Sequence, residues 1–159
     1  MLIKSVAQII GNRQLPKTTP HETVREACYV LDELNVGALA VLDGTELVGV
    51  ISERDVIRKC ICRSRLTAET KVRDIMTTEP RVISVTESLS EALKIMVDGG
   101  FRHLPVMDGS QTVGLLSMRD IPTEYRLMLE RYNEYLESKS APAAVVPSST
   151  TSPEEQRPT

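Results

Sequence analysis

Apolar residues recur with a helical period in two separate segments of this chain. In residues 21–35 they fall at intervals of three or four positions, and they do so again after Ser88. Apolar residues with this spacing lie on one face of an α-helix, so each segment is predicted to be a helix with one buried face. Thr23, with Glu26 three residues later, is predicted to cap the first helix. The two faces are Val24, Ala27, Cys28, Leu31 and Leu34, and Leu89, Ala92, Leu93, Met96 and Val97.

Short aliphatic runs flank two Asp-Gly pairs, Asp43–Gly44 and Asp108–Gly109. An Asp-Gly pair between apolar runs is a strong signal for a tight β-turn, so each pair is predicted to connect a β-hairpin. The runs are residues 38–42 and 46–51 in the first hairpin, and residues 104–107 and 112–116 in the second. A further short strand is predicted over residues 82–85, ahead of the second helix.

The same heptapeptide pattern follows both turns. It reads GVISERD in residues 49–55 and GLLSMRD in residues 114–120, which are 65 positions apart. Self-similarity at a fixed period indicates a structural repeat. We predict an α+β fold of two pseudo-symmetric repeats, each β-α-β-β-α, packed on each other because neither alone could bury its apolar face. The predicted boundaries are residues 1–64 and 65–122.

Pro122 falls where the first copy has Ile57, inside the helix that begins after the serine. Proline removes a backbone hydrogen bond, so this helix is predicted to stop and a new one to run over residues 123–139. Two interpretations of its apolar stripe stay open: it packs on its own domain or on a second subunit. The stripe consists of Tyr125, Met128, Leu129, Tyr132, Tyr135 and Leu136. Residues 140–159 are rich in Ser, Pro, Thr and Ala and are predicted to be disordered.

The composition narrows the partners. Nineteen basic and 22 acidic residues give a net charge of -3, and aromatic residues make up only 3% of the chain. Proteins that grip nucleic acid are usually basic or offer aromatic stacking platforms, so nucleic acid is not an expected partner. The apolar runs are too short to span a bilayer, and no signal peptide is recognisable at the N-terminus. We therefore expect a cytoplasmic protein without a membrane partner.

The Ser-x-x-Asp element in each copy has two interpretations. A serine before a helix with an acidic residue three positions later forms a capping box, which needs no ligand. The glycine ahead of it, however, would allow a close approach of a ligand to the backbone. Arg54 and Arg119 place a cation beside each aspartate. A carboxylate is a good acceptor for two vicinal ribose hydroxyls. Together these features suit a phosphorylated nucleoside better than capping alone.

The order of elements, the two Gly-x-x-Ser-x-x-Asp signatures and the segments VRDIMT and RHLPVMDG resemble a tandem pair of CBS domains, a Bateman module, over residues 1–122. The chain is most similar to the small free-standing bacterial members of that family. The resemblance implies an adenosine-containing ligand such as AMP, ADP, ATP or NAD in the cleft between the repeats. It also implies a homodimer of modules and, as a further partner, an unidentified regulated protein.

Carried over by position, the resemblance implies two sites that are not equivalent. The first is implied to hold the ribose on Asp55 and Ser52, the adenine near the backbone of the other repeat, and a longer ligand on nearby cations. The second is implied to hold the ribose on Asp120 and Ser117, the phosphates on Arg102 and His103, and the adenine near the N-terminal segment. The remaining residues implied for the first site are Arg54, Arg58, Lys59, Thr77, Val82 and Ile83, and for the second Arg119, Gly11, Pro16 and Lys17.

Catalysis has little support in this sequence. The two histidines lie in unlike contexts, and no HExxH, GxSxG or phosphate-binding Walker pattern occurs. No His, Cys and Asp group has metal-ligand spacing. We expect no enzyme activity, no metal and no catalytic cofactor. The leading hypothesis is a nucleotide sensor whose ligand changes the packing of repeats or subunits. The alternative is a ligand-free dimeric scaffold that binds proteins.

Overall fold

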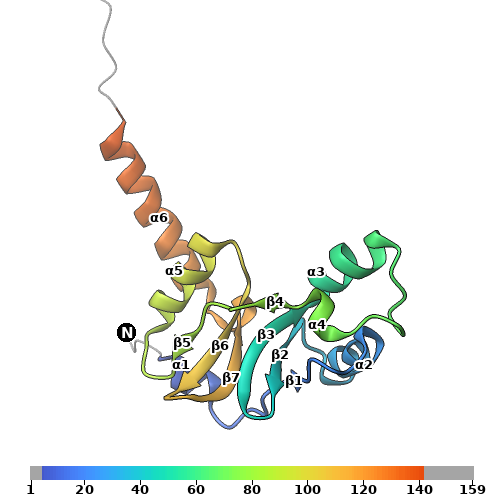
Figure 1. The fold of residues 1–159 in the computed structure, drawn as a ribbon. Coiled ribbons are helices and arrows are strands. Elements are labelled where there is room, and N and C mark those ends of the chain that lie inside the picture. The colour runs from blue at the N-terminus through green and yellow to red at the C-terminus, as the bar shows by residue number, and fades with distance from the viewer. Residues whose placement is uncertain (1–4, 142–159) are drawn as a thin grey trace, which may run out of the picture.

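The computed structural model describes residues 5–141 and contains two small sheets flanked by helices (Figure 1). This confirms the predicted α+β fold, with two repeats and a C-terminal helix. The predicted disordered tail lies outside the described residues beyond position 141. The helices are α1 Val6–Ile10, α2 Val24–Leu34, α3 Glu53–Asp55, α4 Val72–Ile75, α5 Leu89–Gly99 and α6 Thr123–Ser140. The strands are β1 Lys17–Thr18, β2 Ala38–Asp43, β3 Glu46–Ser52, β4 Thr77–Thr78, β5 Ile83–Ser84, β6 His103–Asp108 and β7 Gln111–Ser117.

Each predicted hairpin belongs to one sheet, as the two central strands of the first and as two of the three strands of the second. The first sheet has the order β1-β2-β3-β4 and the second the order β5-β6-β7. In both, the hairpin strands are antiparallel, and the short strand ahead of the helix joins in parallel. Gly44 and Gly109 have φ of 62° and 61° in the turns. Only glycine adopts this left-handed conformation at little cost, which explains the Asp-Gly signal.

The two amphipathic helices also form as predicted, with small differences at their ends. The Thr23 hydroxyl accepts the N–H of Glu26, and the Glu26 carboxylate accepts the N–H of Thr23, which is the predicted capping box at α2. Most members of the two predicted faces are buried, but Cys28 is only partly buried, and the last members are exposed: Leu34 to 40% and Val97 to 48%. Both lie in the last turn of their helix, where the core no longer covers the predicted face.

The two hydrophobic cores exchange helices between the predicted sequence repeats. Val72 and Ile75 of α4 are buried in the core of the first hairpin and α2. Val6 and Ile10 of α1 are buried in the core of the second hairpin and α5. The N–H of Val6 donates to the Glu87 carbonyl at 3.0 Å, which fixes α1 on the second repeat. Each compact unit therefore contains a helix from the other predicted sequence repeat.

A third cluster joins the two units. Ala38 and Val50 from the first sheet meet Leu115 from the second, and Leu15 from the loop after α1 packs against them. The burial of these side chains removes apolar surface from water and holds the repeats together. The two repeats thus pack on each other, as the repeated pattern predicted.

The segments after the two aspartates differ, as Pro122 predicted. After Asp55 the chain continues as a π-helical turn, Val56–Cys60, and a 3-10 turn, Ile61–Arg63. After Ser117 only a 3-10 turn forms, Met118–Asp120, and Ile121 is extended. The proline at 122 disfavours a helical conformation at the residue before it, so α6 begins afresh at Thr123.

The α6 helix (orange in Figure 1) runs from the second repeat away from both sheets. Tyr125 and Leu129 pack against the second core, so the first turns cover their own domain. The rest of the predicted apolar stripe is exposed to 45–58% in the described chain: Met128, Tyr132, Tyr135 and Leu136.

Candidate nucleotide site

Both Ser-x-x-Asp elements form the capping arrangement. In the first repeat the Asp55 Oδ2 accepts the Ser52 N–H at 3.0 Å and the Ser52 hydroxyl at 3.0 Å. The Ser52 Oγ in turn accepts the N–H of Asp55 at 3.2 Å. In the second repeat the Asp120 Oδ2 accepts the Ser117 N–H at 2.8 Å, and the Ser117 Oγ accepts the N–H of Arg119 at 3.3 Å. The capping box therefore forms in both copies, and it uses one oxygen of each carboxylate.

The other oxygen of each carboxylate holds a cation. Lys59 Nζ lies 2.9 Å from Asp55 Oδ1 and also donates to the Ile75 carbonyl at 3.1 Å. Arg13 Nη1 lies 2.9 Å from Asp120 Oδ1, and its Nη2 donates to the Ile9 carbonyl at 2.8 Å. Both carboxylates are largely covered, with side-chain exposures of 12% for Asp55 and 18% for Asp120.

Sequence reasoning missed Arg13. The signal was present, because Arg13 is a basic residue in the N-terminal segment that the resemblance directs towards Asp120. What the sequence could not provide was its reach, since the ion pair joins residues 107 positions apart. The structure therefore brings the N-terminal segment to the Asp120 carboxylate through a side chain that was not on the list of expected residues.

The charges of Asp120, Arg102 and Arg119 all lie close enough to His103 to act on its imidazole. His103 is the partner of Ser117 across the β6–β7 hairpin, and the Arg102 carbonyl accepts the N–H of Met118 at 2.8 Å. Burial lowers the pKa of the His103 imidazole, because a charged ring is poorly solvated there. The Asp120 carboxylate acts in the opposite direction, and the charges of Arg102 and Arg119 lower the pKa further. These four side chains and Arg13 form the Asp120 cluster.

His103 also contacts the first repeat. A Cβ added to Gly37 would lie 3.4 Å from His103 Nε2 and 3.8 Å from an oxygen of Glu53. Ala38 pairs with Ser52 in the first hairpin, and His103 pairs with Ser117 in the second. The first copy therefore has Gly37 and Ala38 at the positions of Arg102 and His103. The imidazole of His103 lies against Gly37, which has no side chain, so the two sites are unequal.

The glycine of each signature lies against another segment of the protein. A Cβ on Gly49 would lie 2.8 Å from both Met76 Sδ and the Thr77 carbonyl oxygen. A Cβ on Gly114 would lie 2.7 Å from Ile10 Cγ2. The exchanged segments of the protein therefore require glycine at both positions. The expectation that these glycines also make room for a nucleotide stays a prediction.

The expected adenine segment near Asp120 is partly engaged in the fold. Gly11 has φ of 50° and its N–H donates to the Ala7 carbonyl, which ends α1. The Pro16 carbonyl accepts the N–H of Ala40 at 2.9 Å, so this part of its backbone is already used. Lys17 pairs with Ala40 in β1 and its side chain is exposed.

The residues expected around Asp55 are more scattered. Arg54 and Arg58 are exposed, and the structure gives neither guanidinium an ion pair within residues 5–141. Thr77 pairs with Val50 in the first sheet. Val82 is 42% exposed, but the Ile83 side chain is 3% exposed in the second core, so only the backbone of Ile83 could meet a ligand.

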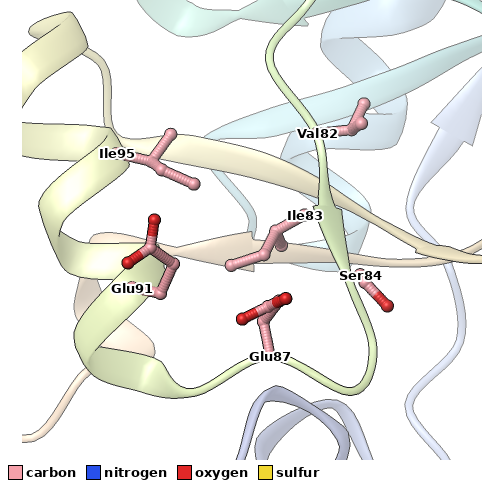
Figure 2. A pocket seen from close by; sticks show the side chains of 6 residues that line it. All are labelled: Val82, Ile83, Ser84, Glu87, Glu91 and Ile95. Carbon is pink, nitrogen blue, oxygen red and sulfur yellow. The ribbon is translucent and has the colours of Figure 1, made fainter.

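Two pockets occur among the described residues, and neither is lined by Asp55 or Asp120. The first, about 460 Å³, is lined by Lys59, Arg63, Arg65 and Asp74. The second, about 250 Å³, lies between β5 and α5 and is lined by Val82, Ile83, Ser84, Glu87, Glu91 and Ile95 (Figure 2). Figure 2 shows the carboxylates of Glu87 and Glu91 on the same side as Ile83. Two carboxylates make this second pocket a poor receptor for phosphates.

Other kinds of site find no support in the described range. Within residues 5–141, no group of three or more His, Cys, Asp or Glu side chains is placed to hold a metal ion. None of the helices described is long and apolar enough to cross a membrane.

The fold and the paired Ser-x-x-Asp turns define a protein of two tandem α+β repeats with one capped carboxylate each. The sequence model of the CBS domain matches residues 6–61 and 72–124. The chain therefore belongs to the CBS domain family, which confirms the resemblance seen in the sequence.

Three relatives illustrate the similarity. The mitochondrial CBS domain-containing protein CBSX3 of Arabidopsis thaliana is 38% identical over 75% of this chain and 62% of its own length. A CBS-domain protein structure from Burkholderia ambifaria is 34% identical with a TM-score of 0.71, covering 74% of this chain and 90% of that one. A CBS domain protein from Pyrobaculum aerophilum, complexed with AMP, is 24% identical with a TM-score of 0.67, covering 82% and 99%. The chain spans about three fifths of the length of the first curated relatives.

Proposed function

We propose that this chain is a regulatory module that senses an adenosine-containing nucleotide between its two CBS repeats. The observation that carries the proposal is the Asp120 cluster, in which the Asp120 carboxylate is paired with Arg13 and acts on His103 together with the charges of Arg102 and Arg119. A carboxylate suits ribose hydroxyls, and the surrounding cations suit phosphates. The structural relative from Pyrobaculum that is complexed with AMP supports this class of ligand.

The two repeats contribute unequally to the proposed binding. At Asp120, the ribose hydroxyls donate to the carboxylate, Arg102 and His103 face the phosphates, and the adenine lies near Gly11, Pro16 and Lys17. At Asp55, Ser52, Arg54, Arg58 and Lys59 provide the polar surroundings, and Thr77, Val82 and the Ile83 backbone lie on the adenine side. The Asp55 site lacks counterparts of Arg102 and His103, so its affinity for phosphates is expected to be lower.

The proposed mechanism is differential binding. His103 already bridges from the second repeat to Gly37 and lies near Glu53 of the first. A nucleotide whose phosphate contacts His103 changes this contact, and it favours the packing of repeats in which its own contacts are best. The proposed output is a change in packing and not a chemical reaction, so neither an enzyme activity nor a catalytic cofactor is part of the proposal.

The test is the Asp120→Ala variant in a thermal-shift assay with AMP, ADP, ATP and NAD. A ligand that binds only the folded state raises the melting temperature, and at 100 times its Kd it stabilises by about 2.7 kcal/mol. The wild-type protein should show such a shift with at least one nucleotide. Asp120→Ala should weaken binding about 100-fold, because two hydrogen bonds to a charged acceptor are lost.

Asp108→Ala is the matched control, since it removes an exposed carboxylate from the adjacent β6–β7 turn. Its shift should equal that of the wild-type protein. Equal shifts in Asp120→Ala and Asp108→Ala would remove the ribose role of Asp120. No shift for the wild-type protein with any nucleotide would favour the alternative, a ligand-free scaffold.

A homodimer is the second part of the proposal, and the exposed stripe of α6 favours it. Met128, Tyr132, Tyr135 and Leu136 together offer an apolar surface at 45–58% exposure that the described chain leaves uncovered. We expect Tyr132→Ser with Leu136→Ser to shift the protein towards monomer in light scattering, while Tyr125 and Leu129 keep the second core covered. Glu130→Ser with Glu137→Ser on the same helix should leave the mass unchanged. A dimer that survives the first pair of substitutions would place the interface elsewhere or, in a scaffold, leave α6 for another partner.

A further inference from the structure

We propose that Arg13 is an internal competitor for the Asp120 carboxylate, which a nucleotide must displace in order to bind; this inference rests on the proposed function. Arg13 lies in the loop between α1 and β1, outside the hairpin and turn that carry Asp120. Its guanidinium joins Asp120 to the end of α1 through bonds of 2.9 Å to Asp120 Oδ1 and 2.8 Å to the Ile9 carbonyl.

The hydrogen bonds of Asp120 explain why a ribose and Arg13 compete. The Oδ2 atom is taken by the Ser117 N–H at 2.8 Å, and the Oδ1 atom by Arg13 at 2.9 Å. Two vicinal hydroxyls need acceptor positions at the exposed part of the carboxylate. With the Asp120 side chain only 18% exposed, the Oδ1 face is the one that Arg13 covers. Removal of the Ser117 bond would instead undo the cap of the turn.

The comparison with Asp55 indicates that Arg13 can be released. Both cations are held a second time by a backbone carbonyl, Lys59 by Ile75 and Arg13 by Ile9, but Lys59 is only four residues from Asp55 on the same helical stretch. Arg13 comes from a loop and its side chain is 50% exposed, so water can solvate its guanidinium after release. A released guanidinium is also a good bidentate partner for a phosphate. The competition should therefore act most strongly on a ligand without phosphate.

The loop that carries Arg13 leads to the contact between the repeats. Two residues later, Leu15 packs on Ala38, Val50 and Leu115, the cluster that joins the two sheets. At the other end of the loop, Ile10 of α1 is buried in the second core. Displacement of Arg13 frees the middle of a segment that is anchored in both places. Occupancy of the Asp120 site is thereby coupled to the packing of the repeats.

The test is calorimetric binding of adenosine and AMP to the wild-type protein, Arg13→Ala and Arg13→Lys. Arg13→Ala should bind adenosine about tenfold more tightly, because one charge-assisted hydrogen bond no longer has to be broken. The gain for AMP should be smaller, since the variant has lost a partner for the phosphate. The affinity of Arg13→Lys for adenosine should lie between those of the wild-type protein and Arg13→Ala, because lysine keeps the charge but not the planar guanidinium. Arg131→Ala removes an exposed arginine from α6 and should bind both ligands as the wild-type protein does.

The outcomes separate this inference from the proposed function. If the wild-type protein binds AMP, but Arg13→Ala binds adenosine no more tightly than the wild-type protein does, the competition is refuted while nucleotide sensing stands. If Arg13→Ala binds adenosine and the wild-type protein does not, the result supports the competition and shows that Arg13 blocks adenosine completely. If neither protein binds adenosine or AMP, and both melt cooperatively, the nucleotide proposal fails and the role of Arg13 fails with it.

Discussion

The two repeats use one sequence pattern to build two different carboxylate sites. In the first, Asp55 is paired with Lys59, which is four residues away and also bonded to the Ile75 carbonyl. In the second, Asp120 is paired with Arg13, 107 residues away. The pattern Ser-x-x-Asp fixes the cap of the turn in both copies, but it does not determine which cation faces the remaining oxygen. Repetition in sequence therefore preserves local structure and leaves the electrostatic partner free to differ.

Pro122 accounts for part of this difference. The helical turn after Asp55 continues and brings a residue four positions later beside the carboxylate, as expected for neighbours on a helix face. After Asp120 the proline ends the turn, and the residue at the same spacing, Glu124, is acidic. The second carboxylate thus receives its cation from another segment. Two differences between the repeats, Pro122 and Glu124, thus accompany the change from a local ion pair to a long-range one.

The largest expected difference between the repeats concerns the signature glycines. Gly49→Ala should destabilise the protein by about 2–3 kcal/mol, because the new methyl group meets a backbone oxygen, that of Thr77, which cannot move without the strand. Gly114→Ala should cost about 1–2 kcal/mol, because the nearest atoms belong to a side chain and not to a strand backbone, although the Ile10 side chain is β-branched and buried. Denaturant unfolding at equilibrium measures both.

Gly37→Ala is the matched control for these two variants. Its Cβ would lie 3.4 Å from the nearest atom, which is ordinary contact, so its loss of stability should be below both. Equal losses for Gly49→Ala and Gly114→Ala would show that the exchanged segments yield equally in the two repeats, and would break the comparison.

A smaller effect is expected from pH, and it should come from the second repeat. Burial lowers the pKa of His103 below its usual 6.5, so the folded state binds a proton less readily than the unfolded state. The contribution to stability is therefore fully present above about pH 6.5 and is lost as the pH falls through and below that value. The melting temperature of His103→Gln should fall less between pH 7.5 and pH 5.5 than that of the wild-type protein.

His21→Gln provides the comparison, since His21 is exposed and lies outside the Asp120 cluster. Its melting temperature should follow the wild-type dependence on pH. If His103→Gln and the wild-type protein lose the same number of degrees, the acid sensitivity lies in other groups and the second repeat has no titrating contact of its own.

Local features of the fold followed from the sequence, whereas long-range ones did not. The period of α2, its Thr23 cap, the two Asp-Gly turns and the stop at Pro122 each depend on residues within one turn or one hairpin, and these predictions are confirmed. The exchange of α1 and α4 between the cores, and the reach of Arg13, depend on which distant segments meet. Nothing in a pattern with a period of a few residues carries that information.

The candidate site divides in the same way. Hairpin register places His103 beside Ser117, and the capping pattern places Asp120 beside Ser117, so these neighbours could be inferred from local rules. At Gly49 and Gly114 the structure shows a close approach of Met76, Thr77 and Ile10, and the local pattern could not specify these distant segments. Whether the remaining residues bind a nucleotide stays a prediction.

The exchange of helices also sets an order for synthesis. The ribosome releases α1 first, yet its buried residues Val6 and Ile10 belong to a core that also requires Ile121. The other core can close once Ile75 has emerged, because its members span only residues 24–75. A nascent chain can therefore complete its first repeat while α1 still lacks the core on which it packs. The N-terminal helix must stay available until nearly the whole module has been made, and only then does the second repeat close around it.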